Sequence, residues 1–373
     1  MTADEVPPRS ARRRRGGVGW GDRATARDVA ALAEVSSQTV SRVANGSPNV
    51  RPETRDRVLA AMAKIGYSPN AAARALRSGR SDTIGVVVHH LVRTGEAHIV
   101  EAVTSTARAR GYAVTLMDAP SGSAHDLNEA ILRLRQGVAG LVVLGLETVD
   151  VDQVRMPART PVVVADSRVL AHPSVGFDQR GGAHMAVTHL LSLGHRTVHL
   201  LGGPEGSIQA AQREEAWRAT LSAAGREVPE PWRGDWTPAS GYEAGRAIAE
   251  NPEVTAVLAA NDEMAAGLMR ALHEAGRRIP EDVSIVGFDD LLAEYLWPPL
   301  TTVHQDFARV GENLMRLLLR QIEGADGKGT GRTGGDGGGS SGGTGDEGGD
   351  DAVFTLVSAG LVIRASTGRA PAR

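Results

Sequence analysis

The chain of 373 residues contains no cysteine, which excludes a disulfide framework and any metal site built on thiolates. It also contains no run of about 18 uncharged apolar residues, so no membrane-spanning helix is predicted. Arginines at 12–15 are followed by glycines, Trp20 and Asp22 rather than by an apolar core, which argues against a secretory signal peptide. These absences favour a cytoplasmic protein.

The composition is that of a globular protein with an uneven distribution of charge. Hydrophobic residues make up 41% and charged residues 23%, and the length allows two or three domains. Residues 1–80 carry 15 Lys and Arg against 7 Asp and Glu, a balance of +8, while the remainder has a balance of −11. A basic head on an acidic body predicts that only the head meets a polyanion. The alternative, a solvated basic tail, explains only part of the excess, because the head keeps +3 without the five arginines at 9 and 12–15.

The pattern of the chain changes along its length. Residues 1–22 are rich in Pro, Gly and Arg and have no apolar period, which is typical of disorder. From Thr25 to about Ser78 the pattern is helical with short loops. From Thr83 onward, short β-branched runs alternate with amphipathic helices, which indicates parallel sheets covered on both faces.

Two such α/β series follow one another and predict two similar lobes with a ligand cleft between them. Strands are predicted at 84–88, 113–117, 140–144, 161–165, 197–201, 256–259 and 284–287, and helices at 98–110, 127–136, 182–193, 210–224, 241–250 and 262–275. A last strand is predicted at 354–363, where it rejoins a sheet.

A glycine-rich tract at 324–351 interrupts this pattern. Between residues 324 and 349 it has 14 glycines and no Val, Leu, Ile or aromatic residue, so it cannot bury a core. We therefore expect a flexible insertion, which leaves 81–323 plus 352–366 as the two-lobed domain and 367–373 as a tail.

The residues from Thr25 predict two short helices joined by a tight turn. Thr25 with Asp28 three positions later is a helix-capping pattern, 35–36 interrupts the helix, and 37–43 restart it. This is a helix-turn-helix, whose second helix enters the major groove of DNA. A third helix from Pro52 would close a small core with Val58, Leu59, Met62 and Ile65. The alternative is a three-helix scaffold that reads no DNA.

The second of these helices carries two side chains long enough to reach base edges. Gln38 suits adenine N6 and N7, and Arg42 suits guanine O6 and N7. Shorter hydrogen-bonding side chains nearby suit phosphates: Ser36, Ser41, Asn45 and Thr54.

A series of ordered motifs carries a resemblance to a known family. The motifs are Asp28-Val29-Ala30, Val35-Ser36, Thr39-Val40-Ser41-Arg42-Val43, Asn45-Gly46, Gly66-Tyr67-Ser68-Pro69-Asn70 and Ala73-Arg74-Ala75-Leu76. They closely resemble the N-terminal signature of the LacI/GalR repressor family, and the resemblance covers residues 25 to about 323 and resumes over 352–366.

The resemblance implies how the head binds DNA. It places a helix-turn-helix domain at 23–69 and a hinge helix or linker at 70–80 that docks in the minor groove of a palindromic operator. Leu76 would be the apolar wedge at the central base step, a known minor-groove device; the alternative is that it packs in the linker. The DNA-contacting set is completed by Arg27, Ser37, Asn49 and Asn70.

The body resembles the family's effector domain, a two-lobed α/β domain of the periplasmic-binding-protein-like type I. The markers are Gly194-His195-Arg196, Leu200-Leu201-Gly202-Gly203, Ala260-Asn261-Asp262, Val286-Gly287-Phe288-Asp289-Asp290 and Pro298-Pro299-Leu300-Thr301-Thr302-Val303. Each cluster falls at a predicted strand end or just beyond it, where open α/β sheets place their ligands.

A sugar site needs hydrogen-bonding groups for the hydroxyls and an apolar face for the ring. Candidates by position are Asp166, Arg213, Asn261, Asp289 and Gln305, with Trp236 for stacking. By the resemblance, these side chains and Phe307 match an inducer site for a galactoside-like hexose or disaccharide. His89-His90 differ from the small hydroxyl residues that the family has after the first strand, and His89 is added as a ligand candidate.

Other interpretations of these residues remain open. Asp262 could act only as a helix cap, Arg213 could be a surface charge, and Asp289-Asp290 could be a catalytic pair. His89-His90 are not expected to bind a metal, because adjacent residues of a strand point to opposite faces. The sequence has no P-loop, HExxH or GxSxG motif, so neither an enzyme nor a cofactor is predicted.

We therefore expect a nucleoid-associated repressor of carbohydrate genes, released from a palindromic operator by a sugar, although some family members use a corepressor instead. The chain ends without a leucine heptad helix, which predicts a homodimer. The alternative is the solute-binding protein of a sugar transporter, which would carry an export signal and no DNA-reading head.

Overall fold

A computed structural model describes residues 24–44, 47–67, 81–89, 91, 93–119, 121, 123–146, 150–327 and 354–372. The chain divides into two compact units, residues 1–80 and 81–373. The predicted N-terminal tail, the hinge at 70–80 and residues 328–351 of the glycine-rich tract lie outside the described residues, as do residues 352–353, Asn45, Asn70 and Leu76.

The first unit has the predicted helix-turn-helix. Its helices are α1 (Ala26–Leu32), α2 (Ser37–Ala44) and α3 (Pro52–Ile65). The capping box at the start of α1 is confirmed: the Thr25 amide donates to the Asp28 carboxylate at 2.7 Å, and the Asp28 amide donates to the Thr25 hydroxyl at 3.4 Å. The core consists of side chains from all three helices, among them Val29, Val40 and Val58. Leu59 was predicted in this core but is 48% exposed, because it follows the buried Val58 by about 100° around the helix.

The first lobe of the second unit is a six-stranded sheet with helices on both faces. The strand order is β11-β5-β4-β3-β1-β2, and all the pairings are parallel. The strands are β1 (Thr83–Val88), β2 (Ala113–Asp118), β3 (Gly140–Val143), β4 (Val162–Ala165), β5 (Ser174–Phe177) and β11 (Phe354–Val357). The helices are α5 (Thr94–Ala109), α6 (Ala124–Leu134) and α11 (Phe307–Gly327), with a 3-10 turn η1 (Val151–Gln153).

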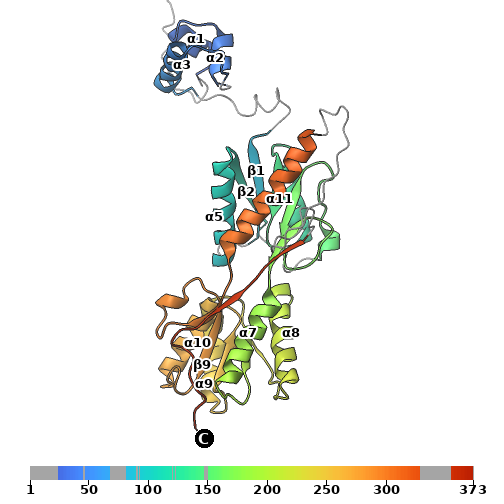
Figure 1. The fold of residues 1–373 in the computed structure, drawn as a ribbon, viewed down its shortest axis with the longest axis vertical. Helices are drawn as coiled ribbons and strands as arrows, with labels where there is room; N and C mark the ends of the chain where they lie inside the picture. Colours follow the sequence, from blue (N-terminus) through green and yellow to red (C-terminus); the bar gives the residue numbers. More distant parts are fainter. Residues whose placement is uncertain are drawn as a thin grey trace, which may run out of the picture. The chain divides into compact units, whose positions relative to one another are not determined.

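Alternate residues of the buried strands fill the two faces of this sheet. Val86 and Val88 pack under α5 and α11, which lie side by side in Figure 1, while Val87 packs under α6. The near-continuous apolar sequence of β1 is therefore buried on both sides, as expected for a parallel sheet.

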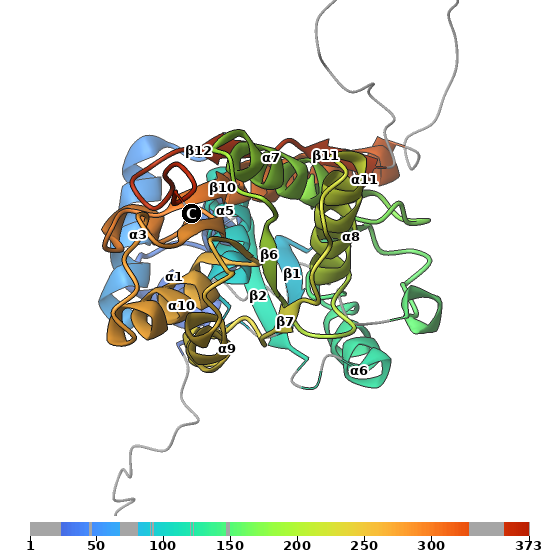
Figure 2. The same cartoon turned by 90° about the horizontal axis from the view of Figure 1, so that it is seen from below.

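The second lobe repeats this arrangement. Its strand order is β12-β10-β9-β8-β6-β7. The strands are β6 (His199–Gly202), β7 (Trp232–Arg233), β8 (Ala256–Ala259), β9 (Ser284–Asp289), β10 (Thr301–His304) and β12 (Gly360–Val362). The helices are α7 (Gln179–Ser192), α8 (Ile208–Ala223), α9 (Pro238–Glu250) and α10 (Asp262–Glu274), with a 3-10 turn η2 (Ala293–Tyr295). Figure 2 shows α7 and α8 on one side of the sheet and α9 and α10 on the other.

The segment predicted as one strand at 354–363 is two strands in different lobes. β11 pairs in parallel with β5 of the first sheet, and β12 pairs antiparallel to β10 of the second, as the red segment in Figure 1 shows. The chain also passes between the lobes from β5 into α7 and from β10 into α11. Three connections between the lobes are the geometry of a hinge.

Both ends of the predicted domain differ from expectation. Helix α11 continues through residue 327, inside the tract that was predicted as a flexible insertion from 324. Residues 367–370 were predicted as a tail but contact the second lobe: Gly368 accepts a hydrogen bond from Ser284 Oγ at 3.2 Å, and the Ala370 amide donates to the Leu193 carbonyl at 3.0 Å. None of the described helices is long and apolar enough to cross a membrane.

Gly267 tests how closely α9 and α10 pack. A Cβ at this position would overlap the Pro238 carbonyl oxygen and lie 2.6 Å from the Tyr242 amide nitrogen, both of them backbone atoms. We expect Gly267→Ala to lower the free energy of unfolding by about 1–3 kcal/mol, measured by chemical denaturation. The control is Gly324→Ala on α11, where a Cβ meets nothing within 4 Å and should stabilise by up to about 1 kcal/mol. Equal effects of the two substitutions would contradict the close packing of α9 on α10.

Candidate functional site

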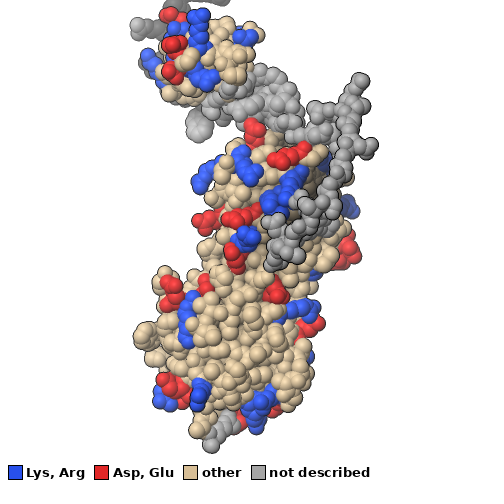
Figure 3. All heavy atoms as spheres, in the orientation of Figure 1, with Lys and Arg blue, Asp and Glu red and all other residues tan. Residues whose placement is uncertain are grey.

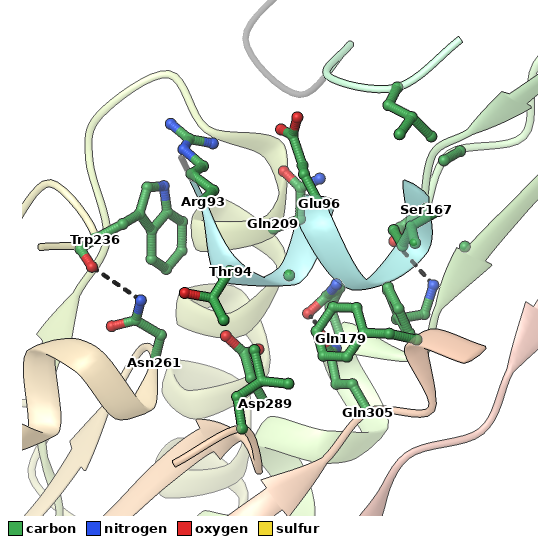
Figure 4. Close-up of a pocket in the computed structure, with 18 of the residues that line it drawn as sticks. Arg93, Thr94, Glu96, Ser167, Gln179, Gln209, Trp236, Asn261, Asp289 and Gln305 are labelled. Atoms are coloured by element: carbon green, nitrogen blue, oxygen red, sulfur yellow. Dashed lines mark hydrogen bonds between the residues drawn. The ribbon is translucent and has the colours of Figure 1, made fainter. Parts of the chain in front are cut away.

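A cleft of about 970 Å³, including its open mouth, lies between the two lobes of the second unit. Its walls come from the carboxyl ends of the strands and the first turns of the helices that follow them, and Figure 4 shows the side chains converging on it. Of the eight predicted ligand residues, seven line this cleft: Asp166, Arg213, Trp236, Asn261, Asp289, Gln305 and Phe307.

The guanidinium of Arg213 is the centre of the cleft floor. The residue is 5% exposed, its Nε donates to Gln179 Oε1 at 2.7 Å, and its Nη1 donates to the Ala260 carbonyl. Its Nη2 lies 3.5 Å from the Asp289 carboxylate, and its Cζ lies 3.8 Å from the ring centroid of Phe288. Burial lowers the pKa of Arg213, and attraction to Asp289 opposes that change. The alternative of a surface charge is therefore wrong.

Asp289 faces Arg213, whereas Asp290 points away from it. Asp290 pairs with Arg364 at 2.7 Å and with His304 at 3.1 Å. The two carboxyl groups therefore have separate partners and do not form the shared site that a catalytic pair requires. Burial raises the pKa of Asp289 to about 7, while the Arg213 charge opposes the rise.

Asp262 ties the start of α10 to neighbouring segments. Its carboxylate accepts from the Thr302 hydroxyl at 2.6 Å and from the Leu291 amide at 3.0 Å. Burial raises the pKa of Asp262 to about 6, and these two hydrogen bonds oppose the rise. The helix cap is the preceding Asn261, whose Oδ1 accepts from the Met264 amide at 2.8 Å, so the interpretation of Asp262 as only a cap is wrong.

Asn261 also positions Trp236. Its Nδ2 donates to the Trp236 carbonyl at 3.0 Å, and Trp236 has a φ of 76°, in the left-handed region that residues with a Cβ rarely adopt. Gly203 lies against the indole, where a Cβ would be 2.6 Å from the ring. The hydrogen bond from Asn261 holds the backbone of Trp236, and the absence of a side chain at Gly203 leaves room for the indole ring at the cleft wall.

Asp166 is less available than its position in the sequence suggests. Arg168 holds it with two side-chain hydrogen bonds of 2.9 and 2.7 Å and donates its amide at 2.8 Å. Its charge is therefore balanced within the first lobe. Phe307 and Phe177 meet edge to face at 4.9 Å between centroids and supply an apolar wall beside it.

His89 does not line the cleft, contrary to the prediction. Its ring is 3% exposed and its Nδ1 lies 2.8 Å from the Ala119 carbonyl oxygen. The position after β1 points into the lobe, and the first turn of α5 forms this wall of the cleft instead.

The prediction missed several cleft residues. Arg93, Thr94, Glu96, Gln179 and Gln209 all lie at or before the first residues of helices. Helix α5 was predicted to begin only at 98, and β5, which leads to Gln179, was not predicted. A polar residue at a helix start is a weak signal for the cleft, because many such residues only cap helices.

Two pairs of side chains couple the segments around the cleft. The Thr94 hydroxyl of the first lobe donates to the Glu263 carboxylate of the second. On the cleft floor, Gln305 Nε2 donates to Gln179 Oε1 at 3.2 Å, and both residues belong to the connections between the lobes. Side-chain contacts therefore join the two lobes across the cleft.

The DNA-reading candidates lie mostly on exposed surface of the first unit, whose charged side chains are visible in Figure 3. Gln38 and Arg42 are exposed one turn apart on α2, opposite the buried Val40 and Val43. Arg27, Ser37 and Asn49 are also exposed, and Ser41 and Thr54 are half-buried. Ser36 accepts from the Thr39 amide at 3.1 Å and so caps α2.

Comparison with known proteins gives two family matches. Residues 25–70 match the model of bacterial regulatory proteins of the lacI family, and residues 187–333 match that of a periplasmic binding protein-like domain. Within the described residues, no group of three or more His, Cys, Asp or Glu side chains could hold a metal ion.

The chain is similar to curated regulators over most of its length. It is 38% identical over 317 residues to the HTH-type transcriptional regulator CelR of Thermobifida fusca, covering 81% of this chain and 93% of that protein. It is 35% identical over 315 residues to the lactose operon repressor of Escherichia coli, covering 81% of this chain and 86% of that one.

Solved structures give the same result. One is the lac repressor dimer bound to operator and the anti-inducer ONPF, with a TM-score of 0.76, 30% identity and coverage of 93% of this chain and 100% of that one. Another is the CelR–cellobiose complex, with a TM-score of 0.64, 32% identity and coverage of 92% and 100%.

The raised pKa of Asp289 predicts how stability depends on pH. Between its ordinary pKa and about 7, Asp289 is protonated in the folded protein and ionised in the unfolded one. Its contribution to the unfolding free energy is therefore fully present below the ordinary pKa and is lost as pH rises through about 7. Since Asn cannot ionise, the melting temperature of Asp289→Asn relative to the unsubstituted protein should rise between about pH 5 and pH 8.

A matched control is Asp282→Asn. Hydrogen bonds from Arg278 lower the pKa of Asp282 to about 2, so this carboxylate stays ionised over the whole range and its substitution should give a constant offset. A pH-independent offset for Asp289→Asn as well would contradict the buried, protonated carboxyl.

Proposed function

The chain belongs to the LacI family of bacterial regulatory proteins and is a DNA-binding transcriptional regulator, and we propose that it is a repressor of carbohydrate-utilisation genes that a sugar releases from a palindromic operator. The observation that carries the proposal is the Arg213-centred cleft between two lobes joined by three connections, on the same chain as a helix-turn-helix head. The proposed domain limits are 23–69 for the head and 70–80 for the hinge. For the effector domain, the predicted 81–323 plus 352–366 extend to residue 327, where α11 ends, and to residue 370, which contacts the second lobe.

The chemistry of the cleft supports a sugar as the effector. The indole of Trp236 and the rings of Phe177 and Phe307 offer apolar faces for the C–H side of a pyranose. Around them are charged and amide side chains that form hydrogen bonds with hydroxyls. Two similar proteins have been solved with cellobiose and with ONPF. A galactoside remains the specific candidate.

Ligand and operator oppose each other through the relative angle of the lobes. A sugar bound between them favours one angle, and the first lobe is the one that follows the hinge in the chain. By linkage, the sugar weakens operator binding by the same factor by which the operator weakens sugar binding. The corresponding coupling free energy is typically about 1–3 kcal/mol. The Thr94–Glu263 contact across the cleft is one interaction that such a change would break or strengthen.

A homodimer fits the surface of the second lobe. Trp297 is 90% exposed and Tyr295 is 83% exposed on one short segment, which is apolar surface that a second copy of the chain would cover. The face of this lobe in Figure 3 carries few charges at its centre. A related structure is a dimer bound to operator, and a symmetric dimer matches a palindromic site.

The alternative of a transporter's solute-binding protein is not favoured, because residues 25–70 match the DNA-binding model of the lacI family. The similar curated proteins are transcriptional regulators rather than enzymes.

The DNA-reading role is tested on α2. We expect Gln38→Ala and Arg42→Ala each to reduce the preference for the operator over a shuffled duplex by about 5- to 150-fold, since a bidentate base contact contributes about 1–3 kcal/mol of discrimination. The measurement is fluorescence anisotropy at two salt concentrations. Arg57→Ala on the exposed side of α3 is the control of equal charge and should leave the preference unchanged. Equal losses on both duplexes would mean that α2 reads no bases.

The effector role is tested at Arg213. We expect Arg213→Lys to bind the operator with normal affinity but to need about 5- to 150-fold more sugar for release, because lysine keeps the charge and loses the planar fork. Arg218→Lys on the same helix, whose side chain is 50% exposed, is the control. If lactose, cellobiose and other sugars change the operator affinity of neither the variant nor the parent protein, the proposed switch is wrong.

A further inference from the structure

Five buried polar side-chain atoms have no hydrogen-bond partner among the described residues. They are Arg55 Nε, Glu96 Oε2, Ser174 Oγ, His199 Nδ1 and Trp236 Nε1. Two of the five, those of Glu96 and Trp236, belong to residues that line the cleft, one from each lobe. Because a buried polar atom without a partner destabilises a fold, an unpaired donor and an unpaired carboxyl oxygen in one cleft point to a ligand that pairs with both.

We propose that Glu96 is a specificity-determining residue of the cleft: its carboxyl group and the indole N–H of Trp236 bind hydroxyl groups of an uncharged saccharide, and the site rejects sugar phosphates. This inference rests on the proposed function and names the class of its effector. Figure 4 shows Glu96 on the first turn of α5 and Trp236 on the second lobe, with Arg93 between them in this view.

The surroundings of Glu96 keep its carboxyl group neutral near neutral pH. Burial raises the pKa of Glu96 to about 8, against the attraction of Arg93 and a hydrogen bond from the His89 backbone, and the nearby Asp118 carboxylate adds to the rise. A protonated carboxyl group donates one hydrogen bond and accepts others. A sugar hydroxyl does the same, so the two are complementary, whereas a phosphate dianion would offer acceptors and charge.

The charges around the cleft also disfavour an anion. Besides the neutral Glu96, its lining includes four acidic side chains: Asp166, Asp262, Glu263 and Asp289. The guanidinium of Arg213 is shared between Gln179, a carbonyl and Asp289, and that of Arg168 holds Asp166. The third, Arg93, is attracted to Asp235, and to Glu96 only when that carboxyl group is ionised. Each guanidinium thus has an acidic neighbour already, and a phosphate group would have to compete for it.

The matched variants are Glu96→Leu, Glu96→Gln and Trp236→Phe in the full chain. Leu fills the space without hydrogen bonds, Gln keeps one donor group and one acceptor, and Phe keeps an aromatic ring without the N–H. Glu101→Gln, on the same helix with a side chain 79% exposed, is the control. Titration calorimetry measures the affinity for three neutral ligands, namely lactose, cellobiose and methyl β-D-galactoside. It also measures the affinity for two charged ones, galactose 6-phosphate and glucose 6-phosphate.

We expect the parent protein to bind at least one neutral sugar and neither phosphate at the same concentrations. Glu96→Leu and Trp236→Phe should each weaken that sugar about 5- to 150-fold, while Glu96→Gln and Glu101→Gln should stay within about 3-fold. Without sugar, Glu96→Leu should melt at the same or a higher temperature and bind the operator normally, because it removes an unpaired buried carboxyl oxygen. A variant that was merely misfolded would instead melt at a lower temperature and lose operator binding.

The outcomes separate the two proposals. If a neutral sugar binds and releases the operator but Glu96→Leu binds it as the parent does, the role of Glu96 is wrong and the proposed function stands. The role of Glu96 is also wrong, and the proposed function still stands, if a sugar phosphate binds more tightly than the neutral sugars. The conclusion is the same if Glu96→Gln binds the neutral sugar as weakly as Glu96→Leu does. If no saccharide binds the parent protein or changes its operator affinity, the proposed function fails as well.

Discussion

The buried guanidinium of Arg213 is the interaction on which the cleft depends. A buried charge is tolerated only when its partners are fixed around it, and the partners of Arg213 come from three elements. Gln179 begins α7 just after the chain crosses between the lobes, Ala260 follows β8, and Asp289 ends β9. The hydrogen bonds and ion pair of this one guanidinium group therefore fix the ends of β8 and β9 and the connection that leads into α7. The ring of Phe288 packs against one face of the guanidinium, with its centroid 3.8 Å from Cζ.

The cleft keeps features that stability alone would not favour. Trp236 and Asp289 both have left-handed backbone angles, and the cleft contains two buried polar atoms without partners among the described residues. Strain of this kind persists where the surroundings over-determine it, and it gathers at ligand sites. The rest of the second unit is close-packed between helices on both faces of each sheet. In the described part of the chain, two of the five unpaired buried polar atoms and two of the four positive-φ residues other than glycine thus lie where a ligand would compensate for them.

Much of the fold could be predicted because its signals are local. The Thr25–Asp28 capping box, the interruption before α2 and the β-branched runs of β1 and β4 depend on neighbouring residues only. The strands that were missed have no such signal: β5 (Ser174–Phe177) is short and contains a glycine, and β7 has two residues. The apolar run at 354–363 does predict extended chain. Nothing in it indicates that Val357 ends in one sheet and Gly360 begins in another, because that depends on where the two sheets lie.

The cleft, too, could be predicted from the sequence only in part. From residue type and position near strand ends and helix starts, the sequence by itself pointed to six residues of the cleft wall, because parallel strands bring their carboxyl ends to one edge. The family resemblance added Phe307. Only the tertiary structure decided what each side chain is free to do. It pairs Asp166 with Arg168, turns His89 into the first lobe and brings Glu96 to the wall. Partner choice and burial depend on residues that are distant in the chain, and a pattern of neighbours carries no information about them.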